Sequence, residues 1–347
     1  MEGCILNDLI NIQKKLVPDV ITIMSNRYRI LQSIHSLQPI GRRVLSTHLG
    51  MTERVLRGEV MFLSQQGLIQ SQSTGMRLTD EGGRVLHRLE DMMKHVSGIP
   101  QLETQLKDIL HLSRIVIVPG NSDEQPWIKN EMGLTCVKVM ESLITDNAVI
   151  AIMGGTTLAA VADMMYPFKQ SQKALFVSAR GGLGEQVENQ ANTICAKMAE
   201  KANGRYRMLH VPDQLSEESY HSLSMEPFIR ESLLLIQSAR MVIHGIGDAM
   251  TMAKRRRASQ ELLDKICKEH AVAEAFGYYF DQNGKVIHRV KTMGLQLEEL
   301  DDKRPVITVA GGKSKANAIE AFFRRGPDSV LVTDEGAAKQ IIQNNHF

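Results

Sequence analysis

Two patterns of hydrophobic positions divide the chain. From about residue 40 to residue 97, apolar residues recur every three or four positions, which is the spacing of amphipathic helices. From Ile115 onward, short apolar runs alternate with amphipathic stretches, which is typical of parallel strands joined by crossover helices. The pattern predicts an N-terminal helical domain with a connector helix over residues 1–97. It predicts a larger α/β domain over residues 98–347.

The N-terminal pattern predicts a helix, a turn and a second helix in that order. Val44, Leu45 and Leu49 have the spacing of one helical face, and Gly50 permits a tight turn. Thr52 is expected to cap the second helix, because a threonine side chain at that position accepts a backbone hydrogen bond. The apolar positions of the second helix are Val55, Leu56, Val60, Met61 and Leu63.

A hairpin is expected directly after the second helix. Segments 68–72 and 76–79 flank Ser73-Thr74-Gly75, which suits a tight turn. Helix, turn, helix and hairpin together are the pattern of a winged helix-turn-helix, whose second helix enters the major groove. The solvent face of that helix, near its start, carries Glu53, Arg54 and Arg57. This domain is therefore predicted to bind double-stranded operator DNA.

The charge of this segment supports contact with phosphate. The whole chain has a net charge of +2, which excludes a histone-like polycation. Between residues 20 and 79 the only acidic residues are Glu53 and Glu59, and arginine, whose planar fork suits phosphate, is present without lysine. A small helical domain for protein contacts, with solvated arginines, is the alternative. The arginines are Arg27, Arg29, Arg42, Arg43, Arg54, Arg57 and Arg77. The predicted DNA contacts are Arg42, Thr52, Glu53, Arg54, Arg57 and Arg77.

A further helix is expected after the hairpin. Its apolar residues Leu86, Leu89, Met93 and Val96 step by three and four, as in a coiled-coil seam, up to an interruption at 98–100. Such a seam either joins two chains or packs on its own domain. We favour a dimer-forming connector, since winged-helix repressors read two half-sites as dimers. Self-association as a dimer or tetramer is therefore predicted.

Length and composition limit the kinds of protein that this chain can be. A chain of 347 residues is long enough for two domains. It has no apolar run long enough to span a membrane and no signal-peptide pattern at its start, so a cytoplasmic protein without a membrane partner is expected. Cys4, Cys136, Cys195 and Cys267 form no Cys-x-x-Cys pair and are expected to be reduced and mostly buried. No metal or cofactor is implied.

Seven apolar runs in the larger domain are predicted to be strands buried on both faces. A mostly parallel, Rossmann-like sheet follows, and in such sheets ligands bind in the loops at the carboxyl ends of the strands. The runs are 115–118, 148–153, 174–177, 207–211, 241–244, 306–309 and 330–332.

Glycine-rich loops that carry threonine, arginine, lysine or aspartate follow four of these runs, at 154–158, 180–184, 245–248 and 311–315. Glycine allows close backbone approach to a ligand, and the free amides of a helix start attract an anion. A basic run at 254–257 follows the third loop, and at most two of its four residues can face one pocket. The alternative is that the glycines are packing turns and the basic residues surface charges. The set predicts a phosphorylated small ligand.

The winged helix and four loop motifs together resemble the SorC family of sugar-responsive bacterial transcription regulators, from about residue 20 to the C-terminus. The family's effector domain is similar to sugar-phosphate isomerases and aminosugar-phosphate deaminases. The resemblance implies a repressor of a glycolytic operon that is relieved by fructose 1,6-bisphosphate, although other members answer to other sugar phosphates. The motifs are Gly154-Gly155-Thr156-Thr157, Ala179-Arg180-Gly181-Gly182, Gly245-Ile246-Gly247-Asp248 and Gly311-Gly312-Lys313-Ser314-Lys315.

The resemblance also implies roles for single residues. Thr156, Thr157 and Lys315 would hold one phosphate of the sugar, and Arg180 and Arg255 would hold the other. Two basic clusters in separate loops suit a ligand with a charge at each end, because charge-assisted hydrogen bonds to phosphate are strong. Carboxylates near the strand ends suit sugar hydroxyls. The predicted effector-binding residues are Gly155, Thr156, Thr157, Arg180, Gln190, Asp248, Arg255, Glu274 and Lys315.

An enzyme with a fused DNA-binding module is the rival function. Sugar-phosphate isomerases and deaminases need a positioned general base, often with a histidine partner. Asp248 is placed where such a base is expected, but residues 249–251 supply no histidine. A nucleotide-binding protein is a third possibility, and the chain lacks both glycine-rich nucleotide motifs at the expected places. The sequence favours a regulator.

Overall fold

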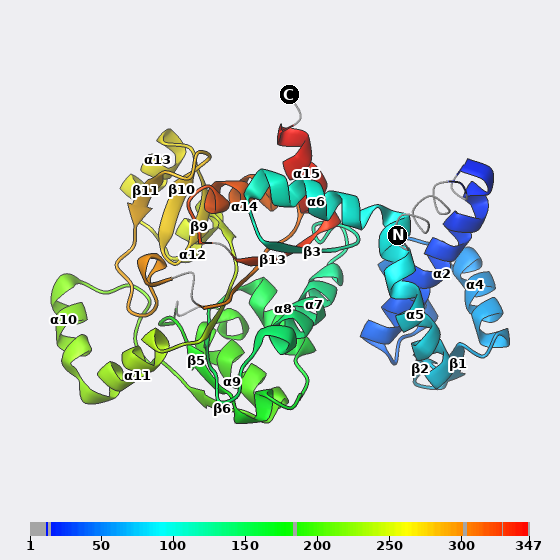
Figure 1. Ribbon diagram of the computed structural model, residues 1–347, viewed down its shortest axis with the longest axis horizontal. Helices are drawn as coiled ribbons and strands as arrows, with labels where there is room; N and C mark the ends of the chain where they lie inside the picture. The colour runs from blue at the N-terminus through cyan, green and yellow to red at the C-terminus, as the bar shows by residue number, and fades with distance from the viewer. Residues whose placement is uncertain (1–11, 13–14, 183–185, 301–303, 328, 346–347) are drawn as a thin grey trace. The chain divides into compact units, whose positions relative to one another are not determined.

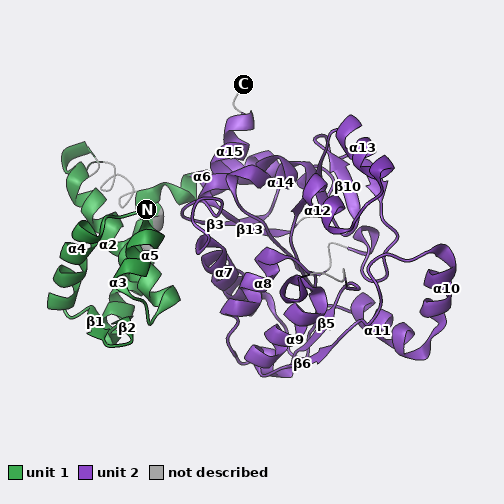
Figure 2. Ribbon diagram, turned by 180° about the vertical axis from the view of Figure 1, so that it is seen from behind, with its two compact units in different colours: residues 1–101 green, residues 102–347 purple. Residues whose placement is uncertain are grey.

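The chain forms two compact units, residues 1–101 and residues 102–347 (Figures 1 and 2). The computed structural model describes residues 12, 15–182, 186–300, 304–327 and 329–345. Cys4 and the end of the second glycine-rich loop, 183–184, lie outside the described residues. Each unit has its own hydrophobic core, and the two are described separately.

The smaller unit contains the helix, turn, helix and hairpin expected from the sequence. Gly50 ends the first helix of the pair in the left-handed conformation, with φ of 65°. Thr52 caps the second, because its hydroxyl accepts a hydrogen bond from the Val55 amide at 3.4 Å. The elements are α2 (Pro18–Leu37), α3 (Arg42–Leu49), α4 (Glu53–Gln65), β1 (Ile69–Gln72), β2 (Gly75–Leu78) and α5 (Asp80–Ser97).

The core of this unit uses fewer apolar positions than predicted. Leu45 and Leu49 are buried, but Val44 is 63% exposed, because successive helix residues are rotated by about 100° and only one face of this short helix meets the core. The expectation that Val44 packs with them was wrong. On α4 the same geometry buries Leu56, Val60 and Leu63 and leaves Val55 and Met61 exposed.

The apolar seam of α5 packs within its own unit. Met93 and Val96 are buried against Tyr28 of α2, and Leu86 and Leu89 pack against the same cluster. This is the alternative that the sequence left open, and the preference for a connector that pairs two chains through this seam was wrong. The reason is that α2 offers an apolar face of matching length.

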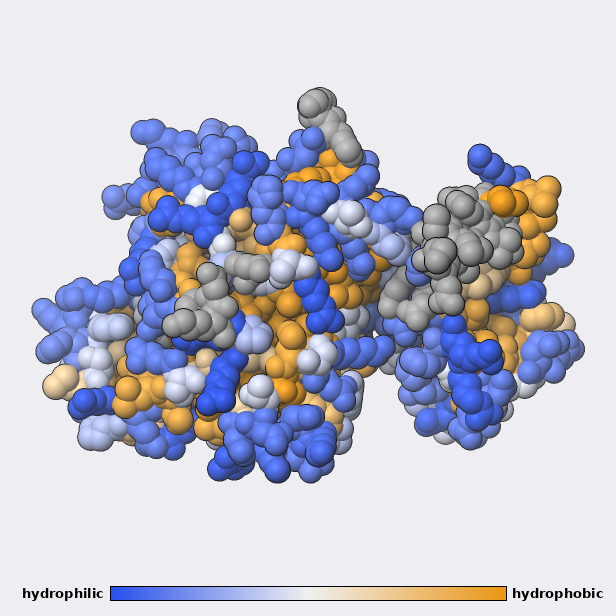
Figure 3. All heavy atoms as spheres, in the orientation of Figure 1, coloured by the Kyte–Doolittle hydropathy of each residue, from blue (hydrophilic) through white to orange (hydrophobic). Residues whose placement is uncertain are grey.

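A row of apolar side chains remains exposed at the start of α2. Leu16 is 76% exposed, Val20 57% and Ile23 44%. Figure 3 shows hydrophobic residues at the surface over this part of the smaller unit. Exposed apolar rows of this kind are typical of surfaces that contact other chains.

The larger unit is built on a seven-stranded sheet whose strands are all parallel, in the order β3-β13-β12-β7-β4-β5-β6. This confirms the predicted α/β fold with a parallel sheet. Three helices, α7 to α9, share one hydrophobic core with the central strands (Figure 1). The strands are β3 (Arg114–Val118), β4 (Val149–Ile152), β5 (Leu175–Ser178), β6 (Arg205–Arg207), β7 (Met241–His244), β12 (Val306–Val309) and β13 (Val330–Asp334).

The helices of this unit lie mostly between successive strands, as crossover connections require. None of the described helices is both long and apolar enough to cross a bilayer. Helix α6 (Ile99–Leu110) begins in the smaller unit and ends in this one. The other helices are α7 (Ile128–Leu143), α8 (Thr156–Met164), α9 (Ala191–Ala202), α10 (Glu217–Met225), α11 (Pro227–Gln237), α12 (Ala249–Arg255), α13 (Gln260–Lys268), α14 (Ala316–Phe323) and α15 (Glu335–Asn345).

One predicted strand is largely a loop. The sequence predicts a strand over 207–211, but β6 ends at Arg207. Leu209 and Val211 are buried in the loop that follows, so their apolar character reflects packing rather than pairing. The side-chain amide of Asn192 bonds to both the amide and the carbonyl of Leu209, at 3.1 Å each, in place of a neighbouring strand.

A second sheet was missed by the sequence analysis. Four antiparallel strands, in the order β11-β10-β9-β8, pack beside α12 and α14. The hairpin between β10 and β11 turns at Asn283-Gly284, with Gly284 at φ of 78°. An Asn-Gly pair between strand-like segments is a strong hairpin signal and would have identified it. The strands are β8 (Gly247–Asp248), β9 (Ala271–Ala275), β10 (Tyr278–Asp281) and β11 (Val286–Arg289).

Candidate functional site

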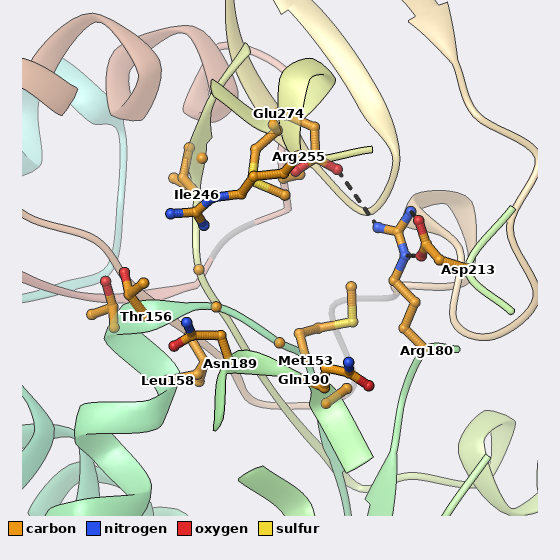
Figure 4. Close-up of a pocket in the computed structure, with 18 of the residues that line it drawn as sticks. Met153, Thr156, Leu158, Arg180, Asn189, Gln190, Asp213, Ile246, Arg255 and Glu274 are labelled. Carbon is orange, nitrogen blue, oxygen red and sulfur yellow. Dashed lines mark hydrogen bonds and ion pairs between the residues drawn. The ribbon is translucent and has the colours of Figure 1, made fainter. Parts of the chain in front are cut away.

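One pocket of the larger unit collects the glycine-rich loops. The loops after β4, β5 and β7 contribute to its wall, Lys315 comes from the loop after β12, and the small antiparallel sheet contributes β9 (Figure 4). All the predicted effector residues except Asp248 line this pocket. The lining members of that set are Gly155, Thr156, Thr157, Arg180, Gln190, Arg255, Glu274 and Lys315.

Asp248 has a different position. Its carboxylate accepts a hydrogen bond from the Thr251 amide at 2.7 Å and so caps the start of α12. The residue is exposed and is not among those that line the pocket. The Asp248 carboxylate therefore stabilises the start of α12, as aspartate does at many helix N-caps.

The start of α8 opens into the pocket. Gly155 stands at the cap position with φ of 130°, a conformation that favours glycine, and no side chain caps the helix. A side chain at this position would meet nothing within 4 Å, so the space beside Gly155 is open. Thr156 and Thr157 begin the helix, whose amide dipoles favour an anion at this end.

Two basic side chains lie at the same side of the pocket. Lys315 donates a hydrogen bond to the Ile246 carbonyl at 3.2 Å, and its pKa is lowered by burial and then by the charges of Lys129 and Arg255. Figure 4 shows the Arg255 guanidinium on the Thr156 side, turned away from Arg180. Neither Arg255 nor Lys315 forms an ion pair within the part of the chain that the structure describes.

We call Thr156, Thr157, Arg255 and Lys315 the cationic end of the pocket. The resemblance grouped Arg255 with Arg180, but the geometry places it with Lys315. The positive charge of Arg255 helps to lower the pKa of Lys315, and both side chains lie next to an uncapped helix start, so a bound anion is favoured here.

A buried carboxylate holds the loop that carries Lys315. Asp334, at the end of β13, is completely buried and accepts hydrogen bonds from the amides of Ser122, Gly312 and Ala337, each at 2.8 Å. Gly312 adopts φ of 98°, which favours glycine. These bonds fix the loop after β12 against the loop after β3, so the position of Lys315 is set by the fold.

The other side of the pocket contains four charged groups that pair with one another. Arg180 donates through Nε and Nη2 to the two oxygens of Asp213, and its Nη1 lies 3.6 Å from Glu274 Oε1. Arg256 donates from Nε to Asp213 Oδ2 at 3.1 Å, from Nη2 to Glu274 Oε1 at 2.8 Å and from Nη1 to the Tyr279 hydroxyl at 2.9 Å. We call Arg180, Asp213, Arg256 and Glu274 the paired end.

The charges of the paired end sum to zero, and all four groups are buried. Burial alone would lower the pKa of Arg256, but the charges of Glu274 and Asp213 more than offset it and raise that pKa. Burial also raises the pKa of Tyr279, so its hydroxyl stays protonated and able to take part in this network. A buried network with every member hydrogen-bonded has a defined geometry.

Arg256 and Asp213 were not predicted. Arg256 belongs to the basic run 254–257, where the sequence allowed one or two residues to face a pocket, and Arg255 and Arg256 are the two that do. Asp213 follows the segment 207–211 that was assigned to a strand, so a carboxylate at the carboxyl end of that segment was the available signal.

The smaller unit exposes most of the predicted DNA contacts. Glu53, Arg54 and Arg57 are exposed near the start of α4, Arg42 is exposed on α3, and Arg77 is half-buried on β2. Arg27 differs, because it pairs with Glu59 at 2.7 Å and stacks on the Phe62 ring. The basic surface is therefore smaller than the arginine count suggested.

Comparison with known proteins identifies the family. Residues 94–343 match the family model of a sugar-binding domain, and residues 23–93 match that of the CggR N-terminal DNA-binding domain. The chain belongs to the SorC family of sugar-binding transcriptional regulators. This confirms the resemblance seen in the sequence.

Several SorC-family relatives match over most of their length. The chain is 56% identical to the central glycolytic genes regulator of Priestia megaterium, over 98% of this chain and 99% of that protein. It is 52% identical to the regulator of the same name from Bacillus subtilis, over 98% of this chain and 100% of that protein.

Solved SorC-family structures have the same fold. A regulator from Enterococcus faecalis is 43% identical, covers 70% of this chain and 99% of its own, and has a TM-score of 0.66. The full-length sorbitol operon regulator SorC from Klebsiella pneumoniae is 17% identical, covers 91% of this chain and 99% of its own, and has a TM-score of 0.63. The second likeness shows the fold alone.

Membership of the SorC family makes the chain a regulator rather than an enzyme. His244, at the end of β7, is buried behind the pocket, where Thr308 Oγ1 lies 2.8 Å from its Nε2. Burial lowers its pKa to about 4, so the ring is neutral at physiological pH. It does not line the pocket and packs against the Phe276 ring, which is a structural role.

Proposed function

We propose that the chain represses a glycolytic operon in the cytoplasm by binding operator DNA through its smaller unit, and that fructose 1,6-bisphosphate in the pocket of its larger unit releases it. The observation that carries the proposal is a pocket with guanidinium groups at both ends. Support also comes from two relatives, over nearly the whole chain, that are named central glycolytic genes regulators.

A bisphosphate fits the charge distribution of the pocket. One phosphate would lie at the cationic end, where Thr157, Lys315 and the start of α8 supply donors. The second would lie near Arg180, across the pocket (Figure 4). Gln190 and Glu274, which also line the pocket, are suited to sugar hydroxyls. A monophosphate would leave one end without its anion.

Release of DNA requires that the ligand distinguish two arrangements of the protein. Fructose 1,6-bisphosphate must bind the DNA-released arrangement more tightly than the DNA-bound one, because a ligand shifts an equilibrium only by its differential affinity. In the bound arrangement Arg54 and Arg57, exposed on α4, would contact the operator.

The proposal is tested by titrating the sugar into a complex of the protein with DNA from upstream of glycolytic genes. Wild-type protein should release the DNA, whereas Thr157→Ala should bind DNA normally and need at least about tenfold more sugar for release. Thr145→Ala is the matched control, because Thr145 is exposed outside the pocket. Release of Thr157→Ala at the wild-type concentration would show that the pocket is assigned wrongly.

DNA contact is tested separately at Arg57. Arg57→Ala should weaken operator binding about tenfold and leave the affinity for the sugar unchanged. Arg84→Ala is the control, because Arg84 is an exposed arginine of the same unit that pairs with Glu81. Equal operator affinity of the Arg57 variant in a gel-shift titration removes Arg57 from the interface.

Self-association as a dimer or tetramer belongs to the same proposal. The exposed row of Leu16, Val20 and Ile23 supports it, since the seam of α5 is occupied by α2. Sedimentation of wild-type protein and of Val20→Lys should show a loss of the higher oligomer in the variant. An unchanged distribution places the contact elsewhere.

A further inference from the structure

The paired end poses a physical problem for a ligand with a second phosphate. Arg180 is the arginine of this end that faces Arg255 across the pocket, and its Nε and Nη2 already donate to Asp213. A phosphate near Arg180 would therefore approach a buried carboxylate of the same sign. Two anions this close repel strongly at low effective dielectric.

The two arginines of this end are held unequally. Arg256 has three partners, namely Asp213, Glu274 and the Tyr279 hydroxyl, at distances from 2.8 to 3.1 Å. Arg180 has Asp213 and a longer 3.6 Å approach to Glu274. If Arg180 left Asp213, the carboxylate would keep its bond to Arg256. No charge would be left buried without a partner, which is the usual cost of breaking such a pair.

The backbone keeps Asp213 in place during such an exchange. The Asp213 amide donates to the Gly182 carbonyl at 2.9 Å, and the Gly182 amide donates to the Val211 carbonyl at 3.0 Å. The loop after β5, which carries Arg180, is thus tied to the loop after β6, which carries Asp213. Because the loops are joined, an exchange of partners is a rotation of the Arg180 side chain rather than a separation of the two loops.

We propose that Asp213 is the pocket's internal competitor for Arg180 and thereby a specificity-determining residue. Without a ligand, the Asp213 carboxylate pairs with the Arg180 guanidinium. Only a phosphate dianion forms a stronger ion pair with Arg180 than this carboxylate does. A sugar hydroxyl or a single negative charge would leave the pair closed. The inference rests on the proposed function, in that it assumes a phosphorylated sugar as the ligand.

In this arrangement the two ends of the pocket bind different phosphates of the ligand. A sugar monophosphate binds at the cationic end and leaves Arg180 with Asp213. A bisphosphate also draws Arg180 to its second phosphate, while Arg256 retains Asp213 and Glu274. Arg256, which the sequence analysis did not identify, is then the positioning residue that stays hydrogen-bonded to Asp213 in both states.

The test measures affinities of wild-type protein and of Asp213→Asn for fructose 1,6-bisphosphate, fructose 6-phosphate and fructose 1-phosphate by calorimetry. Asp213→Asn removes the competing charge and should tighten the bisphosphate about tenfold or more, while each monophosphate changes by less than about threefold. Asp213→Glu, which keeps the charge, should restore the wild-type ratio. Glu231→Gln is the matched control, because Glu231 pairs with Arg207 away from the pocket.

The outcomes separate this inference from the proposed function. Wild-type protein that binds none of the three sugars overturns both. Wild-type protein that binds them, with the ratio between bisphosphate and monophosphates unchanged in Asp213→Asn, overturns the inference alone. So does a variant in which all three affinities weaken together, since that is the effect of a structural role.

A second measurement covers the case in which Asp213→Asn does not fold. The crystal structure of wild-type protein with fructose 1,6-bisphosphate should show Arg180 turned toward a phosphate and Asp213 retained by Arg256. A bound bisphosphate over an intact pair between Arg180 and Asp213 overturns the inference.

Discussion

At the cationic end of the pocket, Arg255 and Lys315 lie together without a carboxylate among the lining residues beside them, next to an uncapped helix start. At the paired end, Arg180 and Arg256 each meet a carboxylate before any ligand arrives. Both ends carry two cationic side chains, so residue counting alone would treat them as equal. Their electrostatic states differ because Asp213 and Glu274 pair directly with the arginines of one end. At the other end, Asp123 and Asp248 attract Lys315, but burial and the charges of Lys129 and Arg255 outweigh them.

The difference indicates a division between affinity and selectivity. The cationic end, whose Arg255 and Lys315 form no ion pair among the described residues, attracts any phosphorylated sugar, since charge-assisted hydrogen bonds to phosphate are strong. At the paired end a ligand must replace an existing partner, so its binding free energy gains only the difference between the new interaction and the one that is lost. The cationic end is thus expected to determine how tightly sugars bind, and the paired end which of them bind best.

The largest expected effect is at Lys315. Lys315→Met keeps the length of the side chain and removes its charge, and should weaken monophosphates and bisphosphate alike by about 30- to 100-fold. Lys313→Met is the matched control, because Lys313 is exposed two positions earlier in the same loop. Calorimetry with both ligand classes checks this. A loss confined to the bisphosphate would show that the two ends have been assigned in reverse.

A smaller and more selective effect is expected at Arg180. Arg180→Gln should weaken the bisphosphate about tenfold and change monophosphate affinity by less than about twofold, because only the second phosphate meets this side chain. The same calorimetric comparison measures it. Equal losses for both ligand classes would mean that the paired end contributes to binding every sugar, and the comparison between the ends would fail.

The pH dependence of monophosphate affinity should follow Lys315. Its pKa is lowered from the ordinary 10.5 by burial and then by Lys129 and Arg255, and phosphate binds the protonated form. Affinity should therefore be full below the lowered pKa and fall as the pH rises through it, at a lower pH than an ordinary lysine would give. Lys315→Met should abolish this slope. If the affinity of the variant still falls with pH, the pH dependence comes from a group other than Lys315.

The smallest effect is expected at Tyr279. Tyr279→Phe removes the hydroxyl that lies 2.9 Å from Arg256 and should cost about 1 kcal/mol of unfolding free energy. Bisphosphate affinity should change by less than about threefold, because Glu274 and Asp213 still hold Arg256. Thermal unfolding and calorimetry together check this. A tenfold loss of affinity with unchanged stability would place Tyr279 in direct contact with the ligand.

Much of the fold followed from local patterns. Strands buried on both faces give continuous apolar runs, so β3, β4, β5, β7, β12 and β13 were predicted close to their observed bounds. The segment 207–211 also contains buried apolar residues, Leu209 and Val211, but they lie in a loop, because burial and strand pairing select the same side chains. The second sheet was missed because its strands are short, because two helices separate β8 from β9, and because the Asn283-Gly284 signal between β10 and β11 was not used.

The pocket was predictable to the extent that it depends on loop chemistry. Gly155, Thr157 and Lys315 could be identified from the sequence, because each belongs to a loop that follows a predicted buried strand. The partners of Arg180 could not be deduced, since Asp213 and Glu274 come from distant parts of the chain and meet only in the folded protein. The grouping of Arg255 with Lys315 likewise depends on how α12 ends, which spacing alone does not give.

Asp334 ties together the segments after β3, β12 and β13 with three backbone hydrogen bonds from a single buried carboxylate. The loop that presents Lys315 is therefore ordered before any sugar arrives, and binding has little conformational entropy left to remove. A preformed receptor of this kind captures its ligand on encounter instead of waiting for a segment to fold.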